Sequence, residues 1–495
     1  MKLRSWLVGS VRILTEKKVL SEYSKDAGIR TIEPRAVLVA EDEGDLLQVI
    51  QRANRDRIPL TPRGSGTSIP SQSVGNGYVV LQSQREVQVV GREFLCTPAV
   101  IKADLNFTLG QSNLWMPVDP SSYRACSIGG MVSNNSSGAR TLKYGSTIDY
   151  VKELIVVLPE EGRRVLKALP LDEALHGDGT TRKVANLVAE NWKTILQEKP
   201  KTTKNSSGYR LERLIHDGLF DLPRLFVGSE GTLCLISRIT CRAMERPPLR
   251  SLLVVSIDSL KDLEILVEEL RPSKPSAVEL LDKSIFLKGG RRELIRQFSG
   301  SEKGYLVYAE LEGKDESELE KVFDRVASNE KLVGFDPLLL TDPGEMSKAW
   351  ETRDITLTIA GEMRSGKRYP VPGIEDLVVP TGKLKDLLAF LETTFADLGL
   401  EFISYGHAGD ANLHVRPLLD LSDGRDKKLH SEIMRNCFEE VWKMGGSITG
   451  EHGDGLLRAE YVKEQYRETY ELMVQIKEIY DPKWLMNPGV KLQRP

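Results

Sequence analysis

The sequence Thr61-Pro-Arg-Gly-Ser-Gly-Thr-Ser68 decides how the N-terminal part of the chain is interpreted. It follows a predicted strand at residues 58–61 and combines glycines, hydroxyl side chains and an arginine, so its backbone N–H groups could wrap a pyrophosphate. It does not match a Walker loop or a dinucleotide-binding G-x-G-x-x-G fingerprint, because no lysine follows the glycines and no long helix is predicted next. Alone, the loop is equally compatible with an ordinary turn.

The residues around this loop predict a mixture of strands and helices. Strands are predicted at 36–40, 58–61, 78–81, 151–158, 225–227 and 234–242, and a helix at 43–55. Two prolines in Met244-Glu-Arg-Pro-Pro-Leu249 then predict a domain boundary. Beyond it, strands at 252–257 and 305–311 alternate with helices at 260–270, 316–331 and 384–398, and a last helix is predicted at 464–479. The pattern favours an α+β or α/β protein of more than one domain.

The composition excludes several classes of protein. With 68 Lys and Arg against 71 Asp and Glu, the formal charge of the 495 residues is −3, which leaves no electrostatic footprint for nucleic acid. The 40% of hydrophobic and 28% of charged residues are typical of a soluble globular chain, whose length allows about three domains, with two or four also possible. No apolar run approaches the roughly 18 residues of a membrane-spanning helix. We therefore expect no nucleic-acid partner and no integral membrane protein.

The cysteines and the N-terminus indicate the compartment. The five cysteines are odd in number and form no C-x-x-C, which is typical of a reducing compartment and excludes an iron–sulfur or cysteine-rich zinc site within the chain. The N-terminal apolar stretch is interrupted by Arg12 and by Lys17-Lys18, so we interpret it as an ordinary or surface-lying helix and not as a signal peptide. We expect a cytoplasmic protein, and a peripheral association with the inner face of the membrane stays open.

Four of the six histidines fall between residues 407 and 452. His407 and His414 are seven residues apart, so they would lie on opposite faces of one uninterrupted strand and can converge only if Gly409-Asp410 makes a turn. Glu451 and His452 come from a second predicted turn. Two imidazoles and a carboxylate suit a divalent metal such as Zn²⁺ with one position left for substrate, and Mn²⁺ or Fe²⁺ would use the same ligand types. The alternative is a pair of hydrogen-bonded core histidines beside a surface turn.

Two further glycine-rich regions repeat the chemistry of the first loop. They are Asp119-Pro-Ser-Ser122 through Ser127-Ile-Gly-Gly130 to Asn134-Asn-Ser-Ser-Gly138, and Val227-Gly-Ser-Glu-Gly-Thr-Leu233. Small residues there let a flat ligand lie against the backbone, and amide side chains supply orientation. The remaining histidine of the window, His430, lies in a polar stretch, and we interpret it as a solvated helix residue without a role.

The three glycine-rich regions and the histidine window together resemble the FAD-linked oxidases of the vanillyl-alcohol oxidase and p-cresol methylhydroxylase type. Within that group the chain is most similar to the D-2-hydroxy-acid dehydrogenases, which include glycolate oxidase subunits, D-lactate dehydrogenases and D-2-hydroxyglutarate dehydrogenases. The resemblance runs from Pro34 to the end of the chain. It also rests on ordered motifs outside those regions, namely Lys143-Tyr-Gly145, Gly208-Tyr209, Gly406-His407, Gly450-Glu-His-Gly453 and Asn487-Pro-Gly489.

The resemblance implies an α+β fold built around a two-subdomain FAD-binding domain of the p-cresol methylhydroxylase type. We expect an N-terminal helical segment at 1–33 and the FAD-binding domain at 34–247. An α+β substrate or cap domain with a metal site is then expected at 248–454, and a C-terminal segment at 455–495 that packs back on the FAD-binding domain.

The resemblance also implies non-covalent FAD. A histidyl link near the N-terminus is excluded because no histidine precedes His176, and Cys126 is interpreted as a small buried residue. The residues implied in FAD binding are Pro62, Arg63, Gly64, Ser65, Gly66, Thr67, Ser68, Asp119, Pro120, Ser121, Ser122, Ser127, Ile128, Gly129, Gly130, Asn134, Asn135, Ser137, Gly138, Glu230, Gly231, Ile236 and Asn487.

The resemblance assigns roles to the remaining site residues. His407, His414 and Glu451 match the family's metal ligands, with Zn²⁺ as the expected ion, and His452 matches its base. Arg353, in Trp350-Glu-Thr-Arg353, matches the arginine that holds the substrate carboxylate, although a W-x-x-R string also fits a solvated helix surface. The implied reaction oxidises a D-2-hydroxy acid to the 2-oxo acid, with a hydride passing from C2 to the flavin.

Several residues depart from the family pattern. Dicarboxylate-specific members place a lysine where this chain has Ile374, which favours a monocarboxylate such as lactate over 2-hydroxyglutarate, although Lys367 and Arg368 lie nearby and could substitute. Ala411 replaces a frequent glycine, and Pro70-Ser71 replaces Ala-Gly or Glu-Gly, so the shapes of these loops could differ.

The electron acceptor and two other functions stay open. The resemblance implies that electrons leave to a quinone, an electron-transfer flavoprotein or a separate iron–sulfur subunit. An alcohol or sugar oxidase that uses O₂ would share the FAD loops without needing the histidine and glutamate set. A non-catalytic flavoprotein subunit of a larger complex would have a decayed site, whereas His407, His414, Glu451 and His452 are all present.

Overall fold

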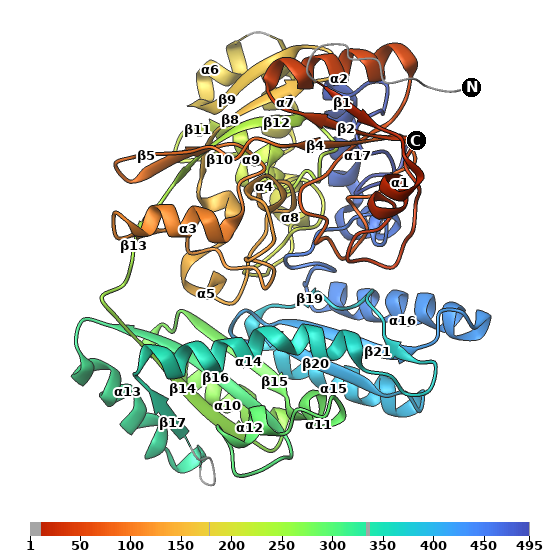
Figure 1. The fold of residues 1–495 in the computed structure, drawn as a ribbon. Helices are drawn as coiled ribbons and strands as arrows, with labels where there is room; N and C mark the ends of the chain where they lie inside the picture. The colour runs from red at the N-terminus through yellow and green to blue at the C-terminus, as the bar shows by residue number, and fades with distance from the viewer. Residues whose placement is uncertain (1–10, 178, 333–336, 495) are drawn as a thin grey trace.

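The computed structural model describes residues 11–177, 179–332 and 337–494. These residues form two domains, one above the other in Figure 1. The chain builds most of the upper domain first, crosses into the lower domain after β13 (Met244–Glu245) and returns to the upper domain with its C-terminal helix. Among the residues described, no helix combines the length and the apolar character needed to cross a bilayer.

A small sheet of strand order β1-β2-β4-β3 begins the upper domain. Its strands are β1 (Arg12–Leu14), β2 (Ala36–Ala40), β3 (Leu60–Pro62) and β4 (Tyr78–Gln82). β2, β4 and β3 run parallel, and β1 pairs antiparallel with β2. Every residue of β2 is buried, and α2 (Glu43–Asp56) packs its apolar stripe on the sheet. Because β3 ends at Pro62, the first glycine loop begins at the edge of this sheet.

A second, antiparallel sheet of order β10-β11-β9-β8-β12-β6-β5 completes the upper domain. Its strands are β5 (Val87–Val90), β6 (Glu93–Cys96), β8 (Val151–Leu158), β9 (Gly162–Pro170), β10 (Ile215–His216), β11 (Leu219–Asp221) and β12 (Leu235–Arg242). The helices of this part are α3 (Lys102–Gly110), α4 (Ile128–Asn134), α5 (Thr141–Tyr144), α6 (Leu171–His176), α7 (Gly179–Glu190), α8 (Trp192–Glu198) and α9 (Pro223–Phe226). The C-terminal helix α17 (Val462–Tyr480) packs on α7 and α8 and contributes to the same apolar core.

The lower domain is built on a sheet of order β17-β14-β16-β15-β20-β21-β18, and β19 also pairs with β21. Its strands are β14 (Leu249–Ile257), β15 (Ala277–Asp282), β16 (Tyr305–Gly313), β17 (Pro337–Leu340), β18 (Tyr369–Pro370), β19 (Leu377–Val378), β20 (Phe402–His407) and β21 (Asn412–Leu419). The chain enters this sheet directly after Pro247-Pro248, which follow the short pairing of β13 with β7 (Leu114–Trp115).

Helices cover both faces of the lower sheet. One face packs on α10 (Leu260–Leu270), α13 (Glu316–Ala327), α15 (Leu384–Asp397) and α16 (Gly424–Lys443). The other face, called the α14 face here, packs on α11 (Lys283–Lys288), α12 (Glu293–Arg296) and α14 (Pro343–Glu362). Leu281, Tyr405 and Leu418 belong to the core of the α14 face. Because side chains alternate along a strand, Glu279 and His414 point to that face as well.

The architecture is the α+β fold that the sequence predicts, with two local differences. Residues 225–227, predicted as a strand, lie at the end of α9, which Pro223 begins as its first residue. The segment 1–33, predicted as helical, contains α1 (Lys17–Tyr23), but β1 in the same segment pairs with β2. Residues 1–10 lie outside the described residues.

Two fully buried lysines of the upper domain differ in their partners. Lys491 Nζ lies 2.9 Å from Glu230 Oε1 and 2.7 Å from Asp454 Oδ2, so it joins the C-terminal segment to the third glycine loop. Lys102 Nζ donates to the carbonyl oxygen of Met116 at 2.8 Å, and no carboxylate of the described chain pairs with it. Burial lowers the pKa of Lys102 to about 8, so its positive charge destabilises the fold at neutral pH.

We expect Lys491→Met to lower the thermal stability strongly and Lys102→Met to leave it equal or higher at pH 7. The first substitution leaves two buried carboxylates without a counter-charge, which costs about 3–5 kcal/mol. The second removes a lysine whose pKa is lower in the folded than in the unfolded chain. The effect of this substitution should shrink above pH 8, because the wild-type lysine loses its proton there. Thermal unfolding of both variants between pH 7 and 9 measures the difference. Equal losses at pH 7 would contradict the assigned partners.

Candidate active site

A groove runs through the upper domain and ends against the lower one. It consists of two cavities of about 360 and 120 Å³. They adjoin each other, because both are lined by Gly64, Ser65, Ser68, Ser127, Gly130 and Asn134. The smaller cavity is closed by Tyr405 and His414 of the hairpin β20–β21 and by Glu451 and His452. The groove therefore connects the glycine loops with the histidine window.

The wall of the larger cavity is formed by segments of backbone that lie unusually close together. A Cβ atom on Gly64 would lie 2.4 Å from Ser127 Oγ, and one on Gly129 would lie 2.5 Å from Pro98 Cβ. The Ser127 hydroxyl caps α4 and accepts a hydrogen bond from the Gly130 N–H at 3.2 Å. Glycine at these positions is thus required by the packing of the loops on one another.

Most of the predicted FAD-binding residues line the groove, and the exceptions hold its walls. The exceptions are Asp119, Ile128, Asn135, Gly138 and Asn487. Asn487 Nδ2 donates to the carbonyl oxygens of Gln72 and Glu230, at 2.9 and 2.8 Å. A Cβ atom on Gly138 would lie 2.2 Å from the carbonyl oxygen of Asp119, so these two loops also touch through backbone.

The groove contains residues that no sequence motif predicted. Tyr23 of α1 lines the larger cavity beneath the guanidinium of Arg63, 5.2 Å from the centre of its ring. Gln72 lines it as well and donates to the carbonyl oxygen of His452 at 2.9 Å. Tyr405 lines the smaller cavity. Of these three residues, only Gln72 has a position that could have pointed to the groove, because it follows closely after the first glycine loop.

His407 and His414 are brought together by a hairpin. β20 ends at His407, the turn η6 (Ala408–Asp410) follows, and β21 returns with Tyr405 opposite His414. The predicted turn at Gly409-Asp410 is therefore present. Ala411 ends this turn with a φ of 52°, in the left-handed region that favours glycine.

The two loops that depart from the family pattern keep a backbone suited to glycine. Ala411 has a φ of 52° and Ser71 has a φ of 63°. A non-glycine residue in this region costs roughly 1 kcal/mol. The loops therefore hold the left-handed conformation despite the substitutions, and their shape is set by the surrounding contacts.

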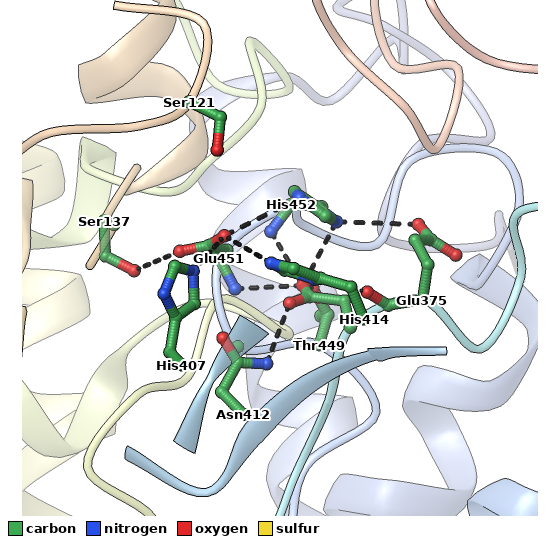
Figure 2. Close-up of polar contacts among 12 residues, drawn as sticks. Ser121, Ser137, Glu375, His407, Asn412, His414, Thr449, Glu451 and His452 are labelled. Atoms are coloured by element: carbon green, nitrogen blue, oxygen red, sulfur yellow. Dashed lines mark hydrogen bonds and ion pairs between the residues drawn. The ribbon is translucent and has the colours of Figure 1, made fainter. Parts of the chain in front are cut away.

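Three imidazole rings point at one carboxylate oxygen (Figure 2). Glu451 Oε1 lies 3.0 Å from His407 Nε2, 3.4 Å from His414 Nε2 and 3.7 Å from His452 Nε2. The side chain of His452 is 21% exposed, whereas those of His407, His414 and Glu451 are 1%, 5% and 9% exposed. His452 is thus the ring of the cluster that is most accessible from the groove.

The second oxygen of Glu451 is held by the upper domain. Glu451 Oε2 accepts hydrogen bonds from Ser137 Oγ and from Lys204 Nζ, both at 3.0 Å. Although burial alone would raise it, the charges of His407 and Lys204 hold the pKa of Glu451 well below its usual range. Glu451 is therefore ionised, and Oε1 is the oxygen that remains available to a ligand.

The Nδ1 atoms of two rings are fixed by acceptors behind them. His407 Nδ1 lies 2.6 Å from Glu279 Oε1, and His414 Nδ1 donates to the carbonyl oxygen of Glu375 at 2.6 Å. Burial lowers the pKa of His414, whereas Glu279 and Glu451 overcome burial and raise the pKa of His407 to about 9. Such acceptors orient metal-binding histidines so that Nε2 faces the ion.

Asp376 is a second carboxylate close to the cluster. It forms, with His414, Glu451 and His452, a group whose donor atoms lie within 4.8 Å of one another. However, Asp376 Oδ2 accepts hydrogen bonds from the N–H groups of Glu451 and His452 at 2.9 and 2.8 Å, and Oδ1 accepts one from Asn412 Nδ2 at 3.1 Å. Asp376 therefore holds the turn in place, and the group of four includes His414 and Glu451 but not His407.

Arg353 lies in the second layer of the cluster. Its Nε and Nη2 atoms donate to Glu279 Oε2 at 2.9 and 2.7 Å, and Nη1 donates to Ser121 Oγ at 2.6 Å. The residue is 7% exposed, so the interpretation as a solvated helix arginine is wrong. Through Glu279 the guanidinium supports His407, and through Ser121 it reaches the wall of the smaller cavity.

The residues that were expected near a second substrate carboxylate lie outside the groove. Lys367 and Arg368 line a surface cavity, and Arg368 Nε pairs with Asp426 Oδ2 at 3.1 Å. Ile374 is buried in the core on the side of the sheet opposite the α14 face. None of the three lines either cavity of the groove.

His430 is buried, and its interpretation as a solvated residue is wrong. Its Nε2 atom donates to the carbonyl oxygen of Pro372 at 2.7 Å, and burial lowers its pKa. A Cβ atom on Gly373 would lie 2.6 Å from the same nitrogen. The ring therefore fixes the segment that leads to Glu375 and Asp376.

Two family models match the chain. The model described as "FAD binding domain" matches residues 34–166. The model described as "FAD linked oxidases, C-terminal domain" matches residues 246–490. The first range falls in the upper domain, and the second covers the lower domain and the return to the upper one.

Curated relatives and a solved structure are also similar to this chain over most of its length. A D-lactate dehydrogenase from Anaerostipes hadrus is 26% identical over 97% of this chain and 94% of its own length. A D-2-hydroxyglutarate dehydrogenase from Escherichia coli (strain K12) is 28% identical over 94% of this chain but 49% of its own length. The structure of p-cresol methylhydroxylase with substrate bound matches 97% of this chain and 93% of its own, with a TM-score of 0.68 and 15% identity. The last comparison confirms the predicted fold.

We expect Gly130→Val to prevent FAD binding without unfolding the chain. Gly130 lines both cavities, and a Cβ atom there would lie 3.3 Å from Ser127 Oγ, its nearest neighbour. The added side chain would therefore project into the groove. The flavin absorbance of the purified protein and the thermal unfolding of the FAD-free chain measure the two effects.

Gly361→Val is the matched control, because nothing lies within 4 Å of a Cβ atom at Gly361 and this residue lines neither cavity of the groove. The control should retain FAD. A Gly130→Val protein that is purified with a full complement of FAD would show that the groove is not the FAD site.

Proposed function

The chain belongs to the family of FAD-linked oxidases, and we propose that it is an FAD-dependent dehydrogenase that oxidises a D-2-hydroxy acid to the 2-oxo acid. The observation that carries the proposal is the convergence of His407, His414 and His452 on Glu451 Oε1 at the end of the groove. FAD binding alone does not need such a cluster, whereas removal of a proton and recognition of a hydroxy acid do. Relatives named as D-lactate and D-2-hydroxyglutarate dehydrogenases support the substrate class.

The groove fits FAD in its chemistry. Its walls combine close-packed glycine backbone with the hydroxyls of Ser65, Ser68 and Ser127 and the amide of Asn134. Bound FAD supplies the two-electron acceptor of the reaction. The chain itself brings the substrate pocket, formed by Tyr405, His414, Glu451 and His452, to the end of this groove.

We propose that His407 Nε2, His414 Nε2 and Glu451 Oε1 hold a divalent ion, with Zn²⁺ as the expected metal. In the described chain Glu451 Oε1 contacts both Nε2 atoms, as well as His452 Nε2 at 3.7 Å, and Glu279 and the Glu375 carbonyl orient the rings of His407 and His414 from behind. A bound divalent ion supplies Lewis acidity, which lowers the pKa of a substrate hydroxyl. Because Ser137 and Lys204 hold Oε2, Glu451 would contribute a single oxygen.

We propose His452 as the base that takes the hydroxyl proton on Nε2. The N–H of its backbone is fixed by Asp376, and its carbonyl oxygen by Gln72. Its Nδ1 atom lies 3.6 Å from Glu375 Oε1 and 3.8 Å from Asp376 Oδ2, so two carboxylates stabilise the imidazolium that forms. Although burial lowers it, these carboxylates raise the pKa of His452 above its usual value.

Arg353 is proposed to hold the substrate carboxylate through Nη1. This nitrogen would exchange the Ser121 hydroxyl for the substrate, while Nε and Nη2 stay on Glu279.

The proposed electron acceptor is a quinone, an electron-transfer flavoprotein or a separate iron–sulfur subunit. The five buried, unpaired cysteines support a cytoplasmic location, with a peripheral place at the inner face of the membrane still open.

We expect His452→Ala to slow anaerobic flavin reduction about 10²- to 10⁴-fold, because proton removal by the base is lost. The measurement is bleaching of the FAD absorbance after mixing with each member of a panel of D- and L-2-hydroxy acids. His216→Ala, which changes a surface histidine of the upper domain, is the control and should reduce like wild type. His452→Ala bleaching at the wild-type rate with every accepted acid would reject this role. Turnover of alcohols or sugars with O₂ consumption would favour an oxidase instead.

We expect the purified wild type to hold about one divalent ion per chain and His414→Ala to lose it. Elemental analysis by mass spectrometry measures the content, and His216→Ala should retain the ion. Treatment with a chelator should abolish flavin reduction by the accepted acid, and added Zn²⁺ should restore it. Full reduction by a protein shown to be metal-free would remove the metal from the scheme.

A further inference from the structure

Arg416 is a buried arginine on the α14 face that the proposed mechanism does not use. It follows His414 by two residues on β21, so both side chains leave the sheet on the same face. Arg416 is 8% exposed, and its Nε atom is buried without a hydrogen-bond partner. Within the described chain, no hydrogen bond or ion pair to its guanidinium is present.

The other buried arginines near this site all have a carboxylate partner. Arg353 pairs with Glu279 at 2.7 Å and Arg458 with Glu375 at 2.5 Å. The remaining buried arginine of the described residues, Arg210, pairs with Glu212 at 2.6 Å. A buried guanidinium without a counter-charge is costly, so its retention here points to an anion that comes from outside the chain.

Glu375 is the carboxylate whose charge acts on Arg416, but both of its oxygens already have other partners. Its Oε1 atom pairs with Arg458, and its Oε2 atom accepts the N–H of Gly373. Burial raises the pKa of Glu375, and the charge of Arg416 opposes this less than Arg458 and His452 do, but no ion pair within 4.0 Å joins Arg416 and Glu375. A structural role for Arg416 as the partner of Glu375 is therefore not supported.

Tyr405 links Arg416 to the substrate pocket. It lies opposite His414 in the hairpin, with ring centres 5.2 Å apart, and it lines the smaller cavity. Arg416 pairs with Ile403 in the same hairpin, so its side chain is the diagonal neighbour of Tyr405 on the α14 face. Arg416 is therefore adjacent, on this face of the sheet, to a residue that lines the pocket.

The spacing along β21 suits a short diacid. Two residues of a strand advance about 7 Å, so Arg416 lies about that far beyond His414 and the Glu451 cluster. The terminal carbons of an extended five-carbon diacid lie about 5 Å apart, given C–C bonds of about 1.5 Å. A substrate with its hydroxyl at the Glu451 cluster could thus place a second carboxylate beside Arg416, whose planar fork binds a carboxylate with two hydrogen bonds.

We propose that Arg416 binds the second carboxylate of a dicarboxylic D-2-hydroxy acid, of the 2-hydroxyglutarate or malate type, and so determines the specificity of the site. This inference rests on the proposed function and gives it a substrate class. It replaces the expectation of a monocarboxylate that Ile374 suggested, because Ile374 is buried in the core on the other side of the sheet.

The test compares a diacid with a monoacid in holoenzyme variants. Wild type should prefer D-2-hydroxyglutarate to D-lactate in kcat/KM with a dye acceptor. Arg416→Met should lower kcat/KM for the diacid about 100-fold, which corresponds to about 2.8 kcal/mol, and change that for D-lactate less than about threefold. Arg416→Lys should fall between the two. Arg364→Met, which removes an exposed arginine that follows α14, is the control and should behave like wild type.

Two other results would overturn the role of Arg416 and leave the proposed function standing. An Arg416→Met protein that loses activity equally with both acids would place Arg416 at the shared C1 carboxylate or in the fold. A wild type that reduces with D-lactate but shows no preference for the diacid would equally reject it. FAD content and thermal stability of each variant, measured in the same preparations, identify a folding defect.

A binding experiment separates this inference from the proposed function. Glutarate and butyrate cannot be oxidised at C2 as hydroxy acids, and their binding is followed by the shift of the flavin absorbance. Wild type should bind glutarate about 100-fold more tightly than butyrate, and Arg416→Met should lose that difference. If no 2-hydroxy acid reduces the flavin but this preference is present, the proposed function fails and the dicarboxylate site stands. If both acids bind equally, the site is rejected whatever the activity.

Discussion

The buried carboxylate of Glu451 is the interaction on which the site depends. Ser137 and Lys204 of the upper domain hold its Oε2 atom, while Oε1 faces the imidazoles of His407 and His414 on the lower sheet. If the domains moved apart, an ionised side chain that is 9% exposed would lose its counter-charges, which is strongly destabilising. The contact that fixes the two domains against each other is therefore also the one that assembles the cluster.

Further buried ion pairs set the orientation of the functional groups. Glu279 joins Arg353 to His407, and Glu375 joins Arg458 to the neighbourhood of His452. Each carboxylate has a guanidinium on one side and an imidazole on the other, so the ring is held in one direction. Buried pairs add little net stability compared with apolar packing, but they fix geometry, and here the geometry is that of the reacting groups.

The sequence predicts the local parts of this site and misses the distant ones. The spacing of His407 and His414 requires a turn at Gly409-Asp410, and the hairpin has it, because a strand period is a local rule. Lys204 and Glu279 belong to no motif, and they are 247 and 128 residues away from the side chains they contact. His430 was misread because a polar stretch on a helix does not show which residue of it faces the core.

Specificity illustrates the same limit. Ile374 occupies a position that the family pattern links to diacid recognition, but its side chain is buried in the apolar core and says nothing about what the α14 face offers. That face carries Arg416, which forms no ion pair within 4.0 Å in the described chain and whose Nε atom has no hydrogen-bond partner. A monocarboxylate would leave this guanidinium buried and unpaired in the complex, whereas a diacid would neutralise it. Under the proposed role of Arg416, the distribution of charge around the pocket, rather than one aligned position, sets which acid the site binds well.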